Sequence, residues 1–150
     1  MFYEVAVGHT LPHDPIKALV APRPIGWVSA LGPNGEVNLS PYSFFNLITD
    51  RPHPMLMFSS AGKKDAVSFI EATGEFVCSI ASFRQRSQVN ATSAPLPRGQ
   101  NEFVWASLEM VPSSIVRPPR VGGAPAALEC RHVQTINLRS HDGEIGRAHV

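Results

Sequence analysis

Proline and glycine interrupt this sequence at short intervals, and that punctuation constrains the fold more than any other feature. The 150 residues include 14 Pro and 11 Gly. Because proline fixes φ and lacks a backbone N–H, long helices are disfavoured over most of the chain. The apolar runs between the breaks have the length of strands, as in IGWVSAL at residues 25–31 and MLMFSS at residues 55–60. The pattern predicts one domain of short strands.

The clearest local prediction is a hairpin. Residues 25–31 and 36–43 are both rich in strand formers, and they flank the turn sequence GPNG at residues 32–35. Asn-Gly tolerates the positive φ that a tight turn requires, so the two strands are predicted to pair antiparallel. Pro41 cannot donate to a ladder, which indicates an edge strand or a bulge.

The remaining elements follow from periodicity. Residues 63–73 have a helical period and stop at Gly74, and residues 84–94 are predicted as a short helix. Residues 1–22 are predicted to be an extended lead-in. Further strands are predicted at residues 55–60 and 75–81, and a long strand is predicted within residues 126–138. About five antiparallel strands with one or two short helices are typical of a small, mainly β barrel.

Composition excludes several classes of function. The chain is 43% hydrophobic and 17% charged, with a formal net charge of +1. This is an ordinary globular composition without the excess positive charge of nucleic-acid-binding proteins. No apolar run is long enough for a membrane span, and the first residues do not resemble a signal peptide. Cys78 and Cys130 are therefore predicted to be buried thiols in a reducing cytoplasm.

Sequence motifs of metal and nucleotide sites are missing. The 6 histidines form no recognisable ligand set, and the sequence contains no CxxC, GxGxxG, Walker A or GxSxG motif. No metal is predicted, and no residue is nominated as catalytic. A nicotinamide cofactor that reacts here would have to dock without its usual binding fold.

One segment has the chemistry of an anion site. SSAGKKD, at residues 59–65, joins a predicted strand to a predicted helix, so its hydroxyls and lysines surround free helix amides. This arrangement suits a phosphate monoester. The alternative is structural: Ser60 or Asp65 caps the helix, and the lysines are solvated.

A second pair of segments suits a flat aromatic ligand. VSA at residues 28–30 and SFFN at residues 43–46 combine strand amides, small side chains and hydrogen-bonding groups. The alternative is that the polar residues face solvent, which alternation alone would explain. The aromatic residues of these segments, Trp27, Phe44 and Phe45, are most simply interpreted as core or interface residues.

Taken in order, these segments resemble the flavin reductase-like family with the FMN-binding split barrel. The resemblance runs from about residue 20 to residue 138. It is carried by RPIGWVSALGPNGEVNLSPYSFFN, PHPMLMFSSAGKKDAVSFIEATGEFVCSIAS, QVNATSAPLPRGQNEF, PPRV and LECR. It implies an antiparallel Greek-key split β-barrel, a homodimer and non-covalently bound FMN.

The resemblance also implies a set of cofactor-binding residues. They are Trp27, Val28, Ser29, Ala30, Ser43, Phe44, Phe45, Asn46, Ser59, Ser60, Lys64 and Asp65. Asn90, Ser93 and Pro95 match a segment that is expected to cover the site, and no chemistry is assigned to them.

The activity that the resemblance implies is hydride transfer between NADH or NADPH and FMN, with a monooxygenase or another protein as electron acceptor. The alternative is an FMN-binding electron carrier or storage protein without nicotinamide activity. A third interpretation is a split barrel that has lost its ligand and serves only as an interaction module.

The end of the sequence departs from the family. The family continues through a final strand and a C-terminal segment, whereas this chain stops after EIGRAHV at residues 144–150. Those residues are also the translation of a common sequencing-adapter DNA. We therefore expect an incomplete split-barrel domain at residues 1–143 and a non-native read-through tail at residues 144–150. The alternative is a genuine last strand.

Overall fold

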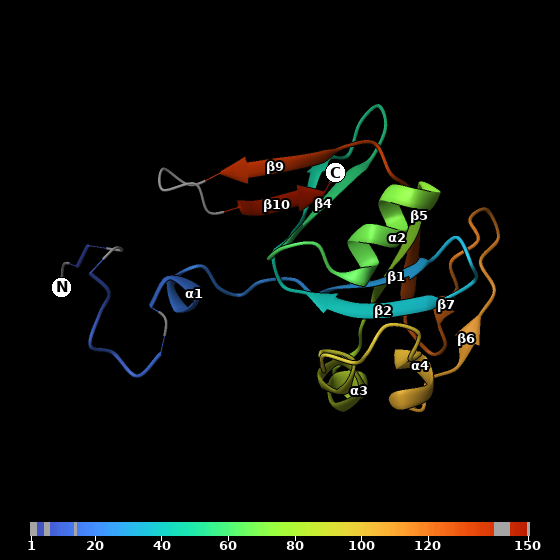
Figure 1. The fold of residues 1–150 in the computed structure, drawn as a ribbon, viewed down its shortest axis with the longest axis horizontal. Coiled ribbons are helices and arrows are strands. Elements are labelled where there is room, and N and C mark those ends of the chain that lie inside the picture. Colours follow the sequence, from blue (N-terminus) through green and yellow to red (C-terminus); the bar gives the residue numbers. More distant parts are fainter. Residues whose placement is uncertain (1–2, 5–6, 14, 140–144, 150) are drawn as a thin grey trace.

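Two antiparallel sheets make up most of the fold (Figure 1). A computed structural model describes residues 3–4, 7–13, 15–139 and 145–149. The strands are β1 (Gly26–Leu31), β2 (Val37–Tyr42), β3 (Phe45–Thr49), β4 (Met55–Ser60), β5 (Glu75–Ile80), β6 (Met110–Val111), β7 (Arg120–Val121), β8 (Ala126–Arg131), β9 (Thr135–Arg139) and β10 (Ile145–His149). The helices are α1 (Pro15–Leu19), α2 (Asp65–Thr73), η1 (Phe83–Gln85), α3 (Arg86–Ala91) and α4 (Glu102–Trp105).

The first sheet confirms the predicted hairpin. Its strand order is β2-β1-β5-β8, and β1 pairs antiparallel with both β2 and β5. Gly35 in the connecting turn has a φ of 88°, the region that favours glycine. Pro41 lies in β2 at the edge of this sheet, where its missing N–H leaves no ladder bond unmade.

The second sheet has the strand order β3-β4-β10-β9. Among the described strands, hydrogen bonding forms two separate four-stranded sheets and a two-stranded pair of β6 and β7, not one closed barrel. The backbone of β10 pairs antiparallel with β4 and β9. Residues 144 and 150 of the predicted tail lie outside the described residues, and the read-through origin of residues 144–150 stays a prediction.

Residues 126–138 are predicted to contain a long strand, but the structure divides them between two shorter strands, β8 and β9. The chain leaves the first sheet after β8 and enters the second sheet as β9. The backbone N–H of His132 donates to the carbonyl of Gly74 at 2.8 Å, which extends the β5–β8 register by one residue before the chain leaves the first sheet. The His132 ring also contacts the Thr135 hydroxyl at 3.0 Å. Alternation breaks at this corner, where Arg131 and His132 are both polar.

Other elements differ from the sequence predictions at their ends. The lead-in is not wholly extended, because Pro15–Leu19 forms α1; proline is favoured at the first position of a helix. Residues 7–13 lie apart from the sheets (Figure 1). The strands β3, β6 and β7 and the short helix α4 were not predicted, because each is too short to show a period.

The main core lies between α2 and the first sheet. The predicted helix is confirmed as α2, which ends at Gly74 with a φ of 75°. Its buried residues pack with side chains from both sheets. This core cluster contains Val28, Ala30, Tyr42, Phe58, Ala66, Val67, Phe69, Ile70 and Phe76. Packing on this cluster therefore fixes the position of the start of α2.

A second core cluster holds Trp27, Leu39, Phe103 and Val121. The indole Nε1–H of Trp27 donates to the Thr92 hydroxyl at 2.9 Å, and both side chains are buried.

Thr92→Val removes the hydroxyl that accepts from Trp27 while keeping the volume of the side chain. We expect the free energy of unfolding to fall by about 1 kcal/mol because a buried donor loses its partner. Urea unfolding monitored by Trp fluorescence measures it; an unchanged midpoint would contradict the assignment.

Candidate functional site

A cavity of about 300 Å³ lies where the predicted anion segment meets the segment expected to cover it. It is lined by Asn38, Ser40, Lys64, Asp65, Ser93, Ala94, Pro95, Leu96 and Glu102. These residues come from β2, the start of α2, the segment after α3 and the start of α4. The volume is at the lower end of the range found for small-molecule sites.

The start of α2 has the form that an anion site requires. Lys64 is the N-cap residue, with extended backbone (φ −87°, ψ 171°) and no side-chain hydrogen bond to the helix. The alternative in which Ser60 or Asp65 caps the helix is not observed. The Ser60 hydroxyl donates to the Gly62 carbonyl at 3.1 Å, and the Asp65 carboxylate accepts from Arg98. The first amides of α2 therefore have no capping side chain.

The two adjacent lysines have different environments. Lys63 Nζ lies 2.8 Å from Glu71 Oε2, so its charge is paired along the helix. Lys64 lines the cavity beside the start of α2. A cationic residue thus borders the cavity at the helix start, where the free amides also favour negative charge.

Glu102 is a site residue that the sequence analysis missed. Its side chain is 6% exposed; Oε1 accepts from Asn38 Nδ2 at 2.7 Å, and Oε2 accepts from the Leu39 N–H at 3.0 Å. Burial raises the pKa of the Glu102 carboxyl, and the hydrogen bond from Leu39 opposes this shift. The available signal was Asn101, which caps α4 by accepting from the Phe103 N–H at 2.9 Å and is followed by an acidic first turn.

The predicted ring-side residues of β1 do not line this cavity. Trp27, Val28, Ser29 and Ala30 are all fully buried, on a strand that is paired along both edges. The Ser29 hydroxyl donates to the Pro119 carbonyl. The core interpretation of Trp27 is confirmed. A contribution of this segment to cofactor binding stays a prediction.

The second ring-side segment lies at the start of β3. Phe45 packs against the main core, whereas Phe44 is 52% exposed. The Asn46 side-chain carbonyl accepts from the Leu47 N–H at 2.9 Å. Like Ser43, none of these residues lines the cavity.

Of the predicted site residues, the structure therefore brings Lys64 and Asp65 together, and it places Ser93 and Pro95 opposite them. Ser60 is buried at the end of β4, and the N–H of its neighbour Ser59 donates to the Phe44 carbonyl at 2.8 Å.

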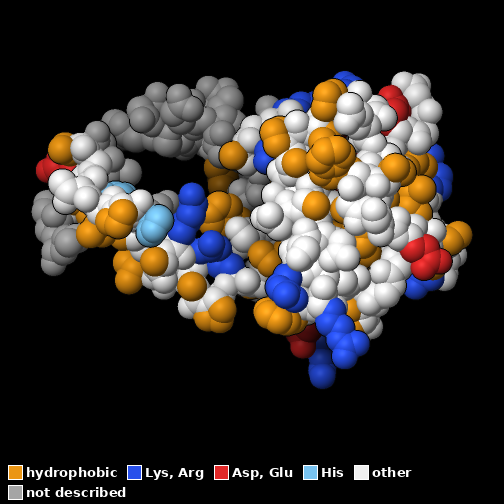
Figure 2. Space-filling view, turned by 90° about the horizontal axis from the view of Figure 1, so that it is seen from below, with side chains coloured by type: hydrophobic (Ala, Val, Ile, Leu, Met, Phe, Trp, Pro, Cys, Tyr) orange, Lys and Arg blue, Asp and Glu red, His pale blue; other side chains and the backbone are white. Residues whose placement is uncertain are grey.

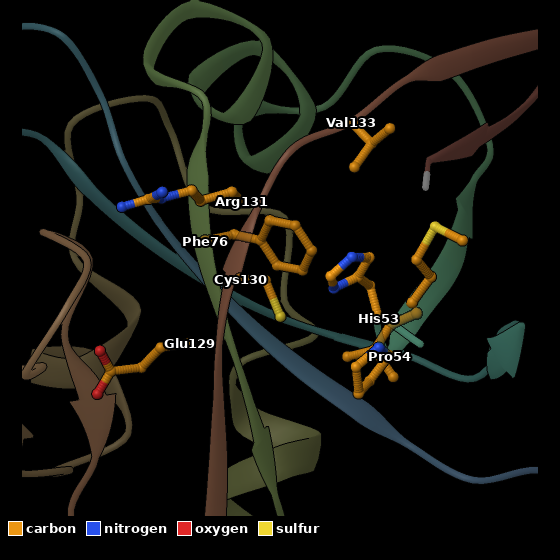
Figure 3. Close-up of a pocket in the computed structure, with 9 residues that line it drawn as sticks. His53, Pro54, Phe76, Glu129, Cys130, Arg131 and Val133 are labelled. Atoms are coloured by element: carbon orange, nitrogen blue, oxygen red, sulfur yellow. The ribbon is translucent and has the colours of Figure 1, made fainter. Parts of the chain in front are cut away.

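A larger cavity of about 460 Å³ lies between β4 and β8 (Figure 3). His53, Phe76, Cys130 and Val133 face it, whereas the charged ends of Glu129 and Arg131 point away. Burial raises the pKa of the Cys130 thiol to about 11, so this thiol is protonated at neutral pH. Among the described residues, no group of three or more His, Cys, Asp or Glu side chains could hold a metal ion. The Arg131 guanidinium, which points away, is not directed at a ligand in this cavity.

The helices and the distribution of surface charge bear on whether the protein spans a membrane or binds nucleic acid. Within the described part of the chain, no helix is both long and apolar enough to cross a membrane. On the face shown in Figure 2, Lys and Arg side chains lie in several separate groups rather than in one field.

Comparison with known proteins gives a consistent family. The model of the family described as "Flavin reductase like domain" matches residues 19–149. An uncharacterized protein of Deinococcus radiodurans is 38% identical over 133 residues, which are 82% of this chain and 58% of that protein. The chain spans between about half and two thirds of the length of the curated relatives that it matches, from 51% to 64%.

Solved structures show the same fold. Nitrilotriacetate monooxygenase component B from Bacillus cereus matches with a TM-score of 0.79 and 27% identity, over 95% of this chain and 79% of that one. Flavoredoxin of Desulfovibrio vulgaris (Miyazaki F) matches with a TM-score of 0.73 and 19% identity, over 99% of this chain and 73% of that one. The predicted mainly β, antiparallel fold is thereby confirmed. The chain belongs to the flavin reductase-like family.

Proposed function

We propose that this protein binds FMN non-covalently and acts as an NAD(P)H-dependent flavin oxidoreductase. The observation that carries the proposal is the cavity in which Lys64 and the uncapped start of α2 meet polar side chains of β2. A cationic side chain and free helix amides, here Lys64 and the start of α2, are what a phosphate monoester requires. Family membership favours a flavin as the rest of the ligand.

The residues present fit the two chemical ends of FMN. Lys64 and the first amides of α2 would hold the phosphate. Asn38 and Ser40 would offer hydrogen bonds to the polar part of the cofactor, and Glu102 holds Asn38 in place. When bound, FMN supplies the ring that exchanges hydride with a nicotinamide. The protein's part is to bind and orient it, and no side-chain acid or base is assigned.

An FMN titration followed by reduction tests the proposal. We expect micromolar protein to retain FMN through gel filtration, with a shifted visible spectrum. In anaerobic stopped flow, NADH or NADPH should then bleach the bound flavin. Retention of FMN without bleaching would contradict the reductase and favour the electron carrier. Failure to retain FMN would contradict both.

We further propose a cytoplasmic homodimer that passes electrons to a monooxygenase or another acceptor. The free thiols Cys78 and Cys130 suit a reducing compartment. Support for the dimer comes from apolar side chains that are exposed on the second sheet, among them Leu47, Ile48 and Leu138. Analytical ultracentrifugation should give twice the chain mass; a monomer at micromolar concentration would contradict the dimer.

A further inference from the structure

An ion pair lies at the edge of the candidate site. Asp65, the first residue of α2, lines the cavity, and its Oδ1 accepts from both Nε (2.8 Å) and Nη2 (2.6 Å) of Arg98. The Arg98 guanidinium also lies 5.8 Å from the centre of the Phe69 ring. Asp65 is therefore a carboxylate at the place where an anion is proposed to bind, and Arg98 compensates its charge.

Arg98 belongs to the segment that forms the facing wall of the cavity. Residues 93–96 line the cavity, and Arg98 follows two residues later. Both ends of the segment are anchored: Thr92 is buried against Trp27, and Glu102 is buried against β2. The pair thus connects this wall to the start of α2.

The charges of the site determine what the pair does. Without Arg98, the carboxylate of Asp65 would repel a phosphate and offset the attraction of Lys64. With Arg98 in place, Lys64 and the helix amides attract an anion, and the carboxylate of Asp65 repels it less. An uncharged ligand of the same shape is indifferent to this balance.

We propose that Arg98, by compensating the charge of Asp65, preserves the preference of this cavity for phosphorylated over unphosphorylated flavin. The inference rests on the proposed function, because it concerns the same cavity. Asp65 acts here through Arg98, as a positioning residue, and Arg98 is a specificity residue.

Opposite effects of the two single substitutions test the proposal. Flavin fluorescence titrations with FMN and riboflavin should show that Arg98→Gln weakens FMN binding about tenfold, because Asp65 is left uncompensated. Asp65→Asn should tighten FMN binding about threefold, because Arg98 is released from its partner. The double variant should return to within about threefold of the wild type, and riboflavin should bind all four proteins alike.

A matched control separates charge from scaffold. Arg117 pairs with Glu75 at 2.9 Å, and the two pairs are similarly exposed (59% and 21%, against 61% and 28% for Arg98 and Asp65). Arg117→Gln should leave both flavin affinities unchanged. If both single substitutions at Asp65 and Arg98 weaken FMN and riboflavin equally, the pair only holds the wall in place, and the proposal is overturned.

Inorganic phosphate distinguishes this proposal from the proposed function. We expect phosphate to raise the melting temperature above that in chloride of equal ionic strength, most in Asp65→Asn and least in Arg98→Gln. If the protein binds neither FMN nor riboflavin but the phosphate-induced increases in melting temperature keep this order, the FMN function is contradicted and the proposed role of the Asp65–Arg98 pair is supported. If phosphate raises the melting temperature equally in all variants, the proposed role of the Asp65–Arg98 pair is overturned.

Discussion

Lys64→Ala is expected to weaken FMN binding about thirtyfold, or about 2 kcal/mol. Lys64 is the lysine that lines the cavity, and it lies at the uncapped start of α2. Its loss removes a charge-assisted contact to the phosphate while the helix amides remain. Fluorescence titration with FMN measures the loss, and riboflavin, which lacks the phosphate, should bind with unchanged affinity.

The neighbouring lysine is the matched control. Lys63 pairs with Glu71 and does not line the cavity, so Lys63→Ala removes the same charge from the next residue. We expect it to change FMN affinity by less than about threefold, the size of a screened surface effect. Equal losses in the two variants would show that only net charge matters and would place the phosphate elsewhere.

Glu102→Ala is expected to lower the free energy of unfolding by about 3 kcal/mol. The substitution leaves two donors without their acceptor, the Asn38 side-chain amide and the Leu39 backbone N–H, in a buried region. Urea unfolding followed by circular dichroism measures the change. Glu109→Ala, at a residue outside this network, is the control and should cost well under 1 kcal/mol. A midpoint like that of the wild type would contradict the role of Glu102.

The same residue predicts a pH dependence. The pKa of Glu102 is raised above its ordinary value of 4.5, chiefly by burial, so the part of its contribution that is linked to protonation is fully present below the unfolded pKa. That contribution is lost as the pH rises through the folded pKa. The pKa values of Glu75 and Glu129 are lowered by hydrogen bonds, and their contributions are lost as the pH falls.

Comparison with Glu102→Gln isolates this effect from the others. From about pH 4.5 upward, the wild type should lose stability relative to Glu102→Gln, because the glutamine cannot ionise. Urea unfolding at a series of pH values gives the two curves. Parallel curves across that range would show that the carboxyl does not titrate differently in the folded state.

The hairpin, the main helix and the strand-to-helix junction at residues 59–65 could be predicted from the sequence because each is encoded locally. The Asn34-Gly35 turn, the alternation around it and the helical period that ends at Gly74 all act within a few residues. The prediction of a long strand within residues 126–138 fails because the chain turns a corner between the two sheets there. The hydrogen bond from His132 to Gly74 that holds this corner joins residues far apart in sequence.

The missing parts of the site are also long-range. Glu102 meets β2 across 63 residues, and Arg98 meets Asp65 across 33. Neither contact leaves a periodic trace in the sequence. For β1, periodicity did not reveal that its serine would be buried, because both edges of the strand are paired and both of its faces are covered.

The most direct test of FMN binding at the start of α2 is a crystal structure of the protein soaked with FMN. We expect the flavin phosphate to lie within hydrogen-bond distance of the Lys64 ammonium and of the first amides of α2, in the cavity lined by residues 93–96. A phosphate bound elsewhere, such as in the cavity lined by His53 and Cys130, with the start of α2 left empty, would contradict it.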